Sequence, residues 1–180
     1  MAEDKSQSTI TDYPSSAARH LIFWPIFVGG LAFDLWTKKA VFAWLVNAQG
    51  QYAIIDGFLR LQLAENPGAA FGIAGGYRVM LVSISMIALL VILAVFIFAL
   101  RKGKIVVVAL ALFAAGISGN LYDRAFNGGL VRDFIVVYWR ERHWPAFNVA
   151  DSMLCTAVGL LIISSLFSPK SCRTPAHPQK

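Results

Sequence analysis

Polar side chains that could do chemistry interrupt the apolar stretches of this 180-residue chain. The acidic and amide groups of interest are Asp34, Asn120, Asp123, Asp133, Asn148 and Asp151. An ionisable group is costly in a stretch that could lie in a bilayer, so each is a candidate functional residue. Two carboxyl groups held close in a partly dry site cannot both ionise, and one keeps a proton. The ionised group can then activate water while the protonated group donates to a carbonyl, which is the minimum for peptide hydrolysis without a metal.

Spacing puts several of these residues on shared helix faces. Lys38 follows Asp34 at i+4, the favourable order for an acid–base pair, and we expect Asp34 near the outer end of its helix. Asn120, Asp123 and Arg124 stand at i, i+3 and i+4 and share another face. A structural ion pair at a helix end would explain either group, although a buried amide such as Asn120 needs several partners. Spacing alone leaves both interpretations open.

Two further groups follow in the chain. Asp133 stands in the segment Val131–Ile135, between strongly apolar neighbours. Asn148 and Asp151 are three positions apart where another apolar run begins, so both face one way if that run is helical. Asp151 could serve there simply as an N-terminal carboxylate stabilised by the helix dipole. The combination of groups is therefore more informative than any single member.

Composition indicates which elements must position these groups. The chain is 57% apolar and only 14% charged, with a mean hydropathy of +0.61. Soluble domains carry roughly twice that share of charge, which excludes a disordered protein and disfavours a soluble globule. We expect uncleaved membrane-spanning helices over about 21–45, 79–100, 105–122 and 152–168. The second run has no charge, Gly or Pro, and at ~1.5 Å per residue it can cross a hydrocarbon core of ~30 Å.

Connections on one side of these helices carry strand signals. The segment Leu59–Leu63 alternates leucine with polar residues, and Phe134–Trp139 is rich in β-branched and aromatic residues. We therefore predict an all-α membrane protein with four transmembrane helices and a small β-sheet and loop layer on the extracytoplasmic face. The expected organisation is a disordered polar tail over 1–18, a four-helix transmembrane domain over 19–169 and a polar C-terminal tail over 170–180.

Basic residues set the expected orientation. The formal net charge is +6, but Lys and Arg gather at the ends of apolar runs, which indicates membrane orientation rather than nucleic-acid binding. Four spans put both termini on one side, and the short basic connection 101–104 favours the cytoplasm for that side. Arginines on the opposite side include Arg124 and Arg132, which stand near aspartates that could neutralise them. The cysteines, Cys155 and Cys172, fit no disulfide framework or metal-type spacing.

Five short motifs occur in order along the chain. They are Asp34–Lys38, Asn66–Gly72, Gly116–Arg124, Val131–Phe134 and Phe147–Ser152. With them the chain resembles the lipoprotein signal peptidases (signal peptidase II), membrane-embedded aspartic peptidases of bacteria. Asn66–Gly72 is similar to that family's Asn-x-Gly-Ala-Ala-Phe loop, and Gly116–Arg124 to its Gly-Asn-x-x-Asp-Arg stretch. Any one motif is weak, whereas five in this order over about residues 20–168 are highly specific.

The resemblance implies an activity and a set of site residues. The catalytic pair would be Asp133 and Asp151, which would cut on the amino side of a diacylglyceryl-modified cysteine and release the signal peptide of a prolipoprotein. The supporting residues would be Asp34, Lys38, Asn66, Gly68, Asn120, Asp123, Arg124 and Asn148. No cofactor, metal or nucleic acid is implied. The partners would be lipid-modified prolipoproteins and membrane lipid, and the enzyme a monomer in the bacterial cytoplasmic (inner) membrane, with both termini cytoplasmic and the site near the extracytoplasmic face.

Three other interpretations remain open. A Ser–Lys peptidase would pair Ser118 or Ser152 with Lys38, although Asp34 is expected to keep that lysine charged. A proton- or ion-coupled transporter also needs intramembrane carboxylates, but places them near the midplane on interrupted helices. A structural membrane subunit would leave the ordered motifs unexplained.

Overall fold

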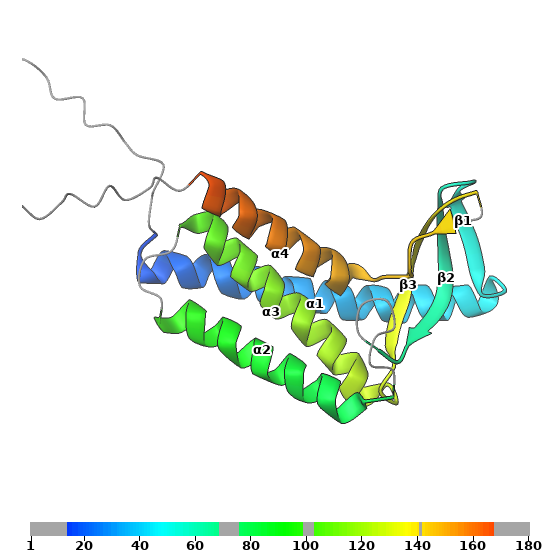
Figure 1. Cartoon of the computed structure of the whole chain (residues 1–180), viewed down its shortest axis with the longest axis horizontal. Coiled ribbons are helices and arrows are strands. Elements are labelled where there is room, and N and C mark those ends of the chain that lie inside the picture. Colours follow the sequence, from blue (N-terminus) through cyan, green and yellow to red (C-terminus); the bar gives the residue numbers. More distant parts are fainter. Residues whose placement is uncertain (1–13, 69–75, 99–102, 141, 168–180) are drawn as a thin grey trace, which may run out of the picture.

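Four long helices lie side by side, with a small sheet at one end of the bundle (Figure 1). The computed structural model describes residues 14–68, 76–98, 103–140 and 142–167. Its helices are α1 (Ser16–Asn47), α2 (Arg78–Phe98), α3 (Lys104–Phe126) and α4 (Val149–Leu166). All four are long and apolar enough to cross a membrane, which confirms the predicted four-span architecture.

Helix α3 is the centre of the bundle. It is the most buried of the four, and α1, α2 and α4 each pack against it. Small residues make this close packing possible: Ala111, Ala114 and Ala115 are fully buried along α3. A side chain at Gly116 would meet the backbone oxygen of Ala150 at 2.7 Å, so α4 can cross α3 only over a glycine.

The helix ends differ from those predicted. Helix α1 begins at Ser16, inside the tail expected over 1–18, because the Ser15 side chain caps it by accepting a hydrogen bond from the Ala18 N–H at 3.2 Å. Helix α4 begins at Val149 rather than residue 152, again after a capping side chain. Hydropathy marks only the apolar part of a helix, whereas caps fix its ends. Residues 1–13 and 168–180, which hold the rest of the expected tails, lie outside the described residues.

The expectation that Asp34 lies near the outer end of its helix was wrong. Helix α1 continues to Asn47, and Figure 1 shows it running on past the end of α4 to lie beside the sheet. This outer part of α1 contacts the second and third strands. Asp34 instead lies opposite the first turn of α4, where its Oδ1 accepts a hydrogen bond from the Ala150 N–H at 2.8 Å.

The sheet is antiparallel, with strand order β1-β2-β3-β4. Its strands are β1 (Gln51–Ile55), β2 (Leu59–Asn66), β3 (Val131–Trp139) and β4 (Arg142–His143). The two predicted strands are confirmed as parts of β2 and β3, which pair with each other and place Ala64 opposite Asp133. Strand β1 was not predicted because all five of its residues are exposed and carry no burial alternation.

Candidate active site

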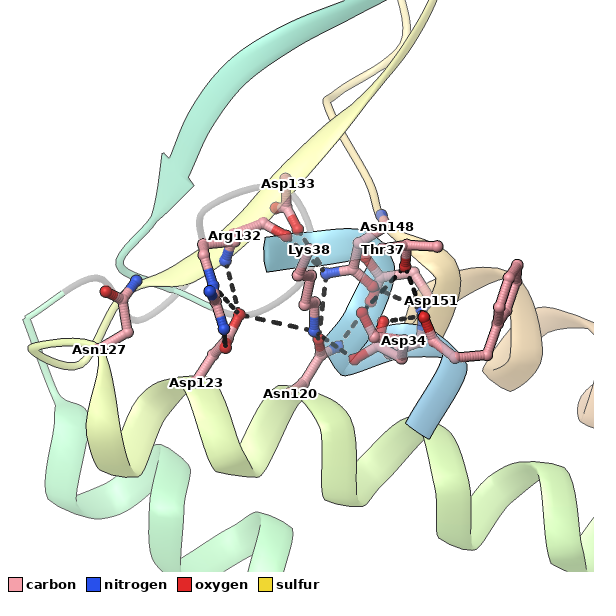
Figure 2. A network of polar contacts seen from close by, with 12 residues as sticks. Asp34, Thr37, Lys38, Asn120, Asp123, Asn127, Arg132, Asp133, Asn148 and Asp151 are labelled. Carbon is pink, nitrogen blue, oxygen red and sulfur yellow. Dashed lines mark hydrogen bonds and ion pairs between the residues drawn. The ribbon is translucent and has the colours of Figure 1, made fainter. Parts of the chain in front are cut away.

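The two aspartates singled out as a catalytic pair face one cavity. Asp133 comes from β3 and Asp151 from the first turn of α4, and both line a cavity of about 660 Å³. Figure 2 shows Asn148 lying between them, at the junction of the strand and the helix. Asp133 and Asp151 are separated in the chain by the β3–α4 connection, but both line the same cavity at the end of the bundle where the sheet begins.

Asp133 is almost completely buried, with 2% of its surface exposed. Its Oδ1 accepts a hydrogen bond from Asn148 Nδ2 at 2.7 Å, and its Oδ2 accepts one from Asn66 Nδ2 at 3.1 Å. Burial, with the charge of Asp151 as the second cause, raises the pKa of Asp133 to about 7, against the opposing effect of these two hydrogen bonds. With a pKa of about 7, the Asp133 carboxyl group is protonated in about half of the molecules at neutral pH.

Asp151 occupies a different setting at the N-terminus of α4. Its Oδ2 accepts a hydrogen bond from the Asn148 backbone N–H at 3.1 Å, and Asn148 Oδ1 accepts one from the Asp151 N–H at 3.0 Å. This reciprocal pair is a capping box. Asp151 Oδ1 accepts a third hydrogen bond, from Asn120 Nδ2 at 2.8 Å. Asp151 is thus the helix-terminal carboxylate that was expected, and it also lines the cavity.

A buried charge cluster lies beneath the two aspartates. Lys38 is fully buried, and its Nζ lies 2.8 Å from Asp34 Oδ2, 3.6 Å from Asp123 Oδ2 and 2.9 Å from Asn120 Oδ1. The predicted i+4 pair of Asp34 and Lys38 is therefore formed within α1, and the Lys38 contact with Asn120 joins α1 to α3. None of these contacts is to a serine, and Ser152 Oγ instead donates to the Asn148 carbonyl at 3.1 Å, so the described residues hold no Ser–Lys pair around Lys38.

Asp123 holds β3 against α3 through its contacts with Arg132. Arg132 reaches it through Nη2, 2.5 Å from Asp123 Oδ1, and through its backbone N–H, 2.9 Å from Oδ2. Asp123 is fully buried, so this ion pair fixes the strand position immediately before Asp133. Arg132 was expected to be neutralised by a nearby aspartate but, unlike Asp123, was not predicted as a site residue.

Arg124 and the Asn66–Gly68 turn form the outer wall of the site. Arg124 Nη2 donates to the Gly68 carbonyl at 2.9 Å, while the Gly68 N–H donates to Asn66 Oδ1 at 2.9 Å. Arg124 is buried and lines the cavity, yet its Nε has no hydrogen-bond partner within the part of the chain that is described. The remainder of the Asn66–Gly72 motif, residues 69–72, lies outside the described residues.

The cavity continues as an apolar slot between α2 and α4. Ile84 and Ala88 of α2, Ile117 of α3, and Leu154 and Cys155 of α4 line this part. Both α2 and α4 pack against α3, but among the described residues they are not closely packed against each other. The contribution of α2 to the cavity was not predicted, because this helix is apolar on every face and its sequence carries no pattern that marks an inward side.

Comparison with known proteins agrees with this architecture. The family model for signal peptidase (SPase) II matches residues 26–167. The lipoprotein signal peptidase of Rhodopirellula baltica is 37% identical over 165 residues, covering 83% of this chain and 73% of its own. That of Geobacter sulfurreducens is 36% identical over 148 residues, covering 81% of this chain and 91% of its own.

A solved structure has the same fold. It is a bacterial membrane enzyme determined by the in meso method at 2.3 Å resolution, with a TM-score of 0.71 and 30% sequence identity. The match covers 91% of this chain and 95% of that one. On the family model and these relatives, the chain belongs to the signal peptidase II family.

Proposed function

We propose that this protein is a membrane-embedded aspartic endopeptidase that removes the signal peptide from diacylglyceryl-modified prolipoproteins. It cuts on the amino side of the lipidated cysteine, with Asp133 and Asp151 as the catalytic pair. The observation that carries the proposal is that these two carboxyl groups line one cavity, where burial raises the pKa of Asp133 to about 7. Membership of the signal peptidase II family supports a peptidase activity, and its relatives carry the name lipoprotein signal peptidase.

The pair supplies both proton transfers of peptide hydrolysis. One carboxylate takes a proton from water, whose oxygen then bonds to the scissile carbonyl carbon, while the protonated carboxyl donates to the carbonyl oxygen. When the tetrahedral intermediate collapses, the carbon–nitrogen bond breaks and the amine leaves with a proton from the pair. Because the two groups share one proton, they titrate as a unit in this cycle.

The surroundings of the pair suit a substrate that stays in the lipid. A signal peptide and its attached acyl chains can approach along the apolar slot between α2 and α4 without leaving the bilayer. Arg124, with a buried donor facing no partner among the described residues, is placed to bind a backbone carbonyl of the peptide. Asn66, Asn120 and Asn148 hold the pair itself.

The proposal includes a location. The enzyme lies in the bacterial inner membrane as a monomeric four-helix peptidase domain over 19–169, with both termini cytoplasmic and the catalytic pair near the extracytoplasmic face. The gathering of polar groups and the sheet at one end of the bundle supports this placement. A reporter fused to the C-terminus and read on either side of the membrane tests the orientation.

The substrate is tested by direct cleavage. Purified protein in lipid nanodiscs is incubated with a diacylglyceryl-modified prolipoprotein and, as the matched control, with the same precursor lacking the lipid. Mass spectrometry should find a product that begins at the lipidated cysteine, and none from the unmodified precursor. Cleavage at another bond, or equal cleavage of both precursors, would contradict the proposed substrate.

A further inference from the structure

The orientation of one buried amide distinguishes the two catalytic carboxyl groups. Asn120 Oδ1 accepts hydrogen bonds from Lys38 Nζ at 2.9 Å and from Asn148 Nδ2 at 3.1 Å. Asn120 Nδ2 points the other way and donates to Asp151 Oδ1 at 2.8 Å. Figure 2 shows the Lys38 side chain reaching down to this amide, with Asp123 to one side. The amide thus connects a buried cation to one member of the pair.

Lys38 prevents the Asn120 side-chain amide from flipping, which would exchange its oxygen and its NH₂ group. An ammonium group has three donors and no acceptor, so a reversed Asn120 would set its NH₂ group against Lys38 Nζ. The same reversal would set that NH₂ group against Asn148 Nδ2 and the Asn120 oxygen against Asp151 Oδ1. Asn148 cannot turn to compensate, because its Oδ1 accepts from the Asp151 N–H at 3.0 Å. While Lys38 is in place, the Asn120 NH₂ group therefore always faces Asp151.

The surroundings of the two carboxyl groups are unequal as a result. Asp151 accepts from the fixed Asn120 amide and from a backbone N–H in the first turn of a helix, where the dipole favours negative charge. Asp133 is the more buried group and lies away from any helix N-terminus, on β3. Its raised pKa agrees with a group that keeps its proton.

We propose that Lys38 is a positioning residue that fixes the Asn120 amide toward Asp151, so that Asp151 is the carboxylate that activates water and Asp133 the carboxyl that keeps the proton. The inference deepens the proposed peptidase function and rests on it for the catalytic roles. Losing a hydrogen bond to the charged form of Asp151 is expected to move the acid limb of the pH profile to higher pH by about one unit.

Several other charged groups surround the pair and must stay unchanged in the test. From α1 there is Asp34, which pairs with Lys38, and from α2 there is Arg78, which donates to the Arg124 carbonyl at 3.0 Å. The others are Glu65 on β2, Asp123 and Arg124 on α3, and Arg132 on β3. Removing Lys38 alone would leave the buried carboxylate of Asp34 without its ion-pair partner, so the variant of choice is the double variant Asp34→Asn/Lys38→Met. The asparagine at position 34 retains an oxygen that can accept the hydrogen bond from the Ala150 N–H. The pair of Asp123 and Arg132 stays intact in this variant.

The first test is the pH dependence of cleavage of a lipidated prolipoprotein. The Asp34→Asn/Lys38→Met protein should show the acid limb of kcat moved to higher pH by about one unit, with KM little changed. Asn120→Asp replaces the donor by an oxygen of the same shape, and should move the limb in the same direction. Lys39→Met, on the exposed neighbour of Lys38, is the matched control and should keep the original profile. A loss of kcat by one factor at every pH would mean a merely structural role and would overturn the inference.

The second test needs no turnover. Infrared spectra of the purified protein, one pH unit below the Asp133 pKa, should contain a protonated carboxyl band that disappears in Asp133→Asn. In Asp34→Asn/Lys38→Met, the more acidic of the two carboxyl titration steps should move to higher pH. A band that persists in Asp133→Asn, or an unmoved acidic step, would overturn the inference even if the protein cleaves prolipoproteins. Failure of wild-type cleavage with these spectra as expected would instead reject the proposed function alone.

Discussion

Asn148 donates a 2.7 Å hydrogen bond from its side-chain amide to Asp133, across the gap between α4 and β3. The same residue caps α4 and bonds the second aspartate through its backbone N–H. One asparagine therefore fixes the helix that carries one carboxyl group and touches the strand carboxyl directly. Asn148 is therefore in direct contact with both aspartates of the proposed catalytic pair.

The two roles of Asn148 can be separated by substitution. Asn148→Ser keeps a good capping side chain but loses the amide donor to Asp133 and to Asn120, so we expect kcat to fall about tenfold or more, with a smaller loss of thermal stability than in Asn148→Ala. Asn148→Ala loses the cap as well and should also be less stable, by about 1 kcal/mol. Cleavage rates and thermal unfolding in detergent give both values. Full activity in Asn148→Ser would show that the bond to Asp133 has no part in catalysis.

The raised pKa of Asp133 predicts how stability depends on pH. The pKa of an Asp in an unfolded chain is near 3.8, whereas the pKa of folded Asp133 is about 7. Between these values the folded protein holds a proton that the unfolded chain has lost, so stability contributed by the protonated group is lost as pH rises through about 7. Thermal unfolding measured across this range should show the decline in wild type and a reduced slope in Asp133→Asn. An equal slope in both proteins would contradict the assignment.

A larger side chain in the apolar slot between α2 and α4 should hinder the access of substrate to Asp133 and Asp151. Ala88→Trp on α2 should block the slot and lower kcat/KM for a lipidated prolipoprotein about tenfold, mainly through KM. Val91→Trp changes the same helix at a position that is 54% exposed, and serves as the control that should leave cleavage unchanged. Equal kinetics in the two variants would exclude this route to the catalytic pair.

The pair of Asp123 and Arg132 predicts a loss of stability rather than a change of chemistry. Asp123→Asn leaves the arginine without its buried partner, and we expect a cost of about 3 kcal/mol. The double variant Asp123→Asn/Arg132→Gln removes both charges and should recover part of that cost in thermal unfolding. If the single and double variants unfold at the same temperature, the ion pair does not hold β3 in place.

Much of this site could be predicted because its residues belong to local patterns. The i+4 spacing of Asp34 and Lys38 gave their ion pair, and the three-residue spacing of Asn148 and Asp151 gave their common direction at a helix start. The need of a buried amide for several partners also held for Asn120, which bonds Lys38, Asn148 and Asp151.

Long-range contacts could not be predicted in the same way. Nothing near Asp34 indicates that its carboxylate accepts the Ala150 N–H on another helix, since that contact depends on how α1 and α4 cross. It also depends on Gly119, where any side chain would collide with the Asp34 carboxylate. Ile84 and Ala88 line the cavity only because of how α2 rotates against α3, and an all-apolar helix carries no sequence signal for that rotation.

We propose that two carboxyl groups perform the hydrolysis, and isosteric substitution of each tests this most directly. Asp133→Asn and Asp151→Asn should each fold like the wild type and each abolish release of the signal peptide from a diacylglyceryl-modified prolipoprotein. Ser118→Ala, on neighbouring α3, should retain most of the activity. Substantial cleavage by either folded asparagine variant would contradict the account.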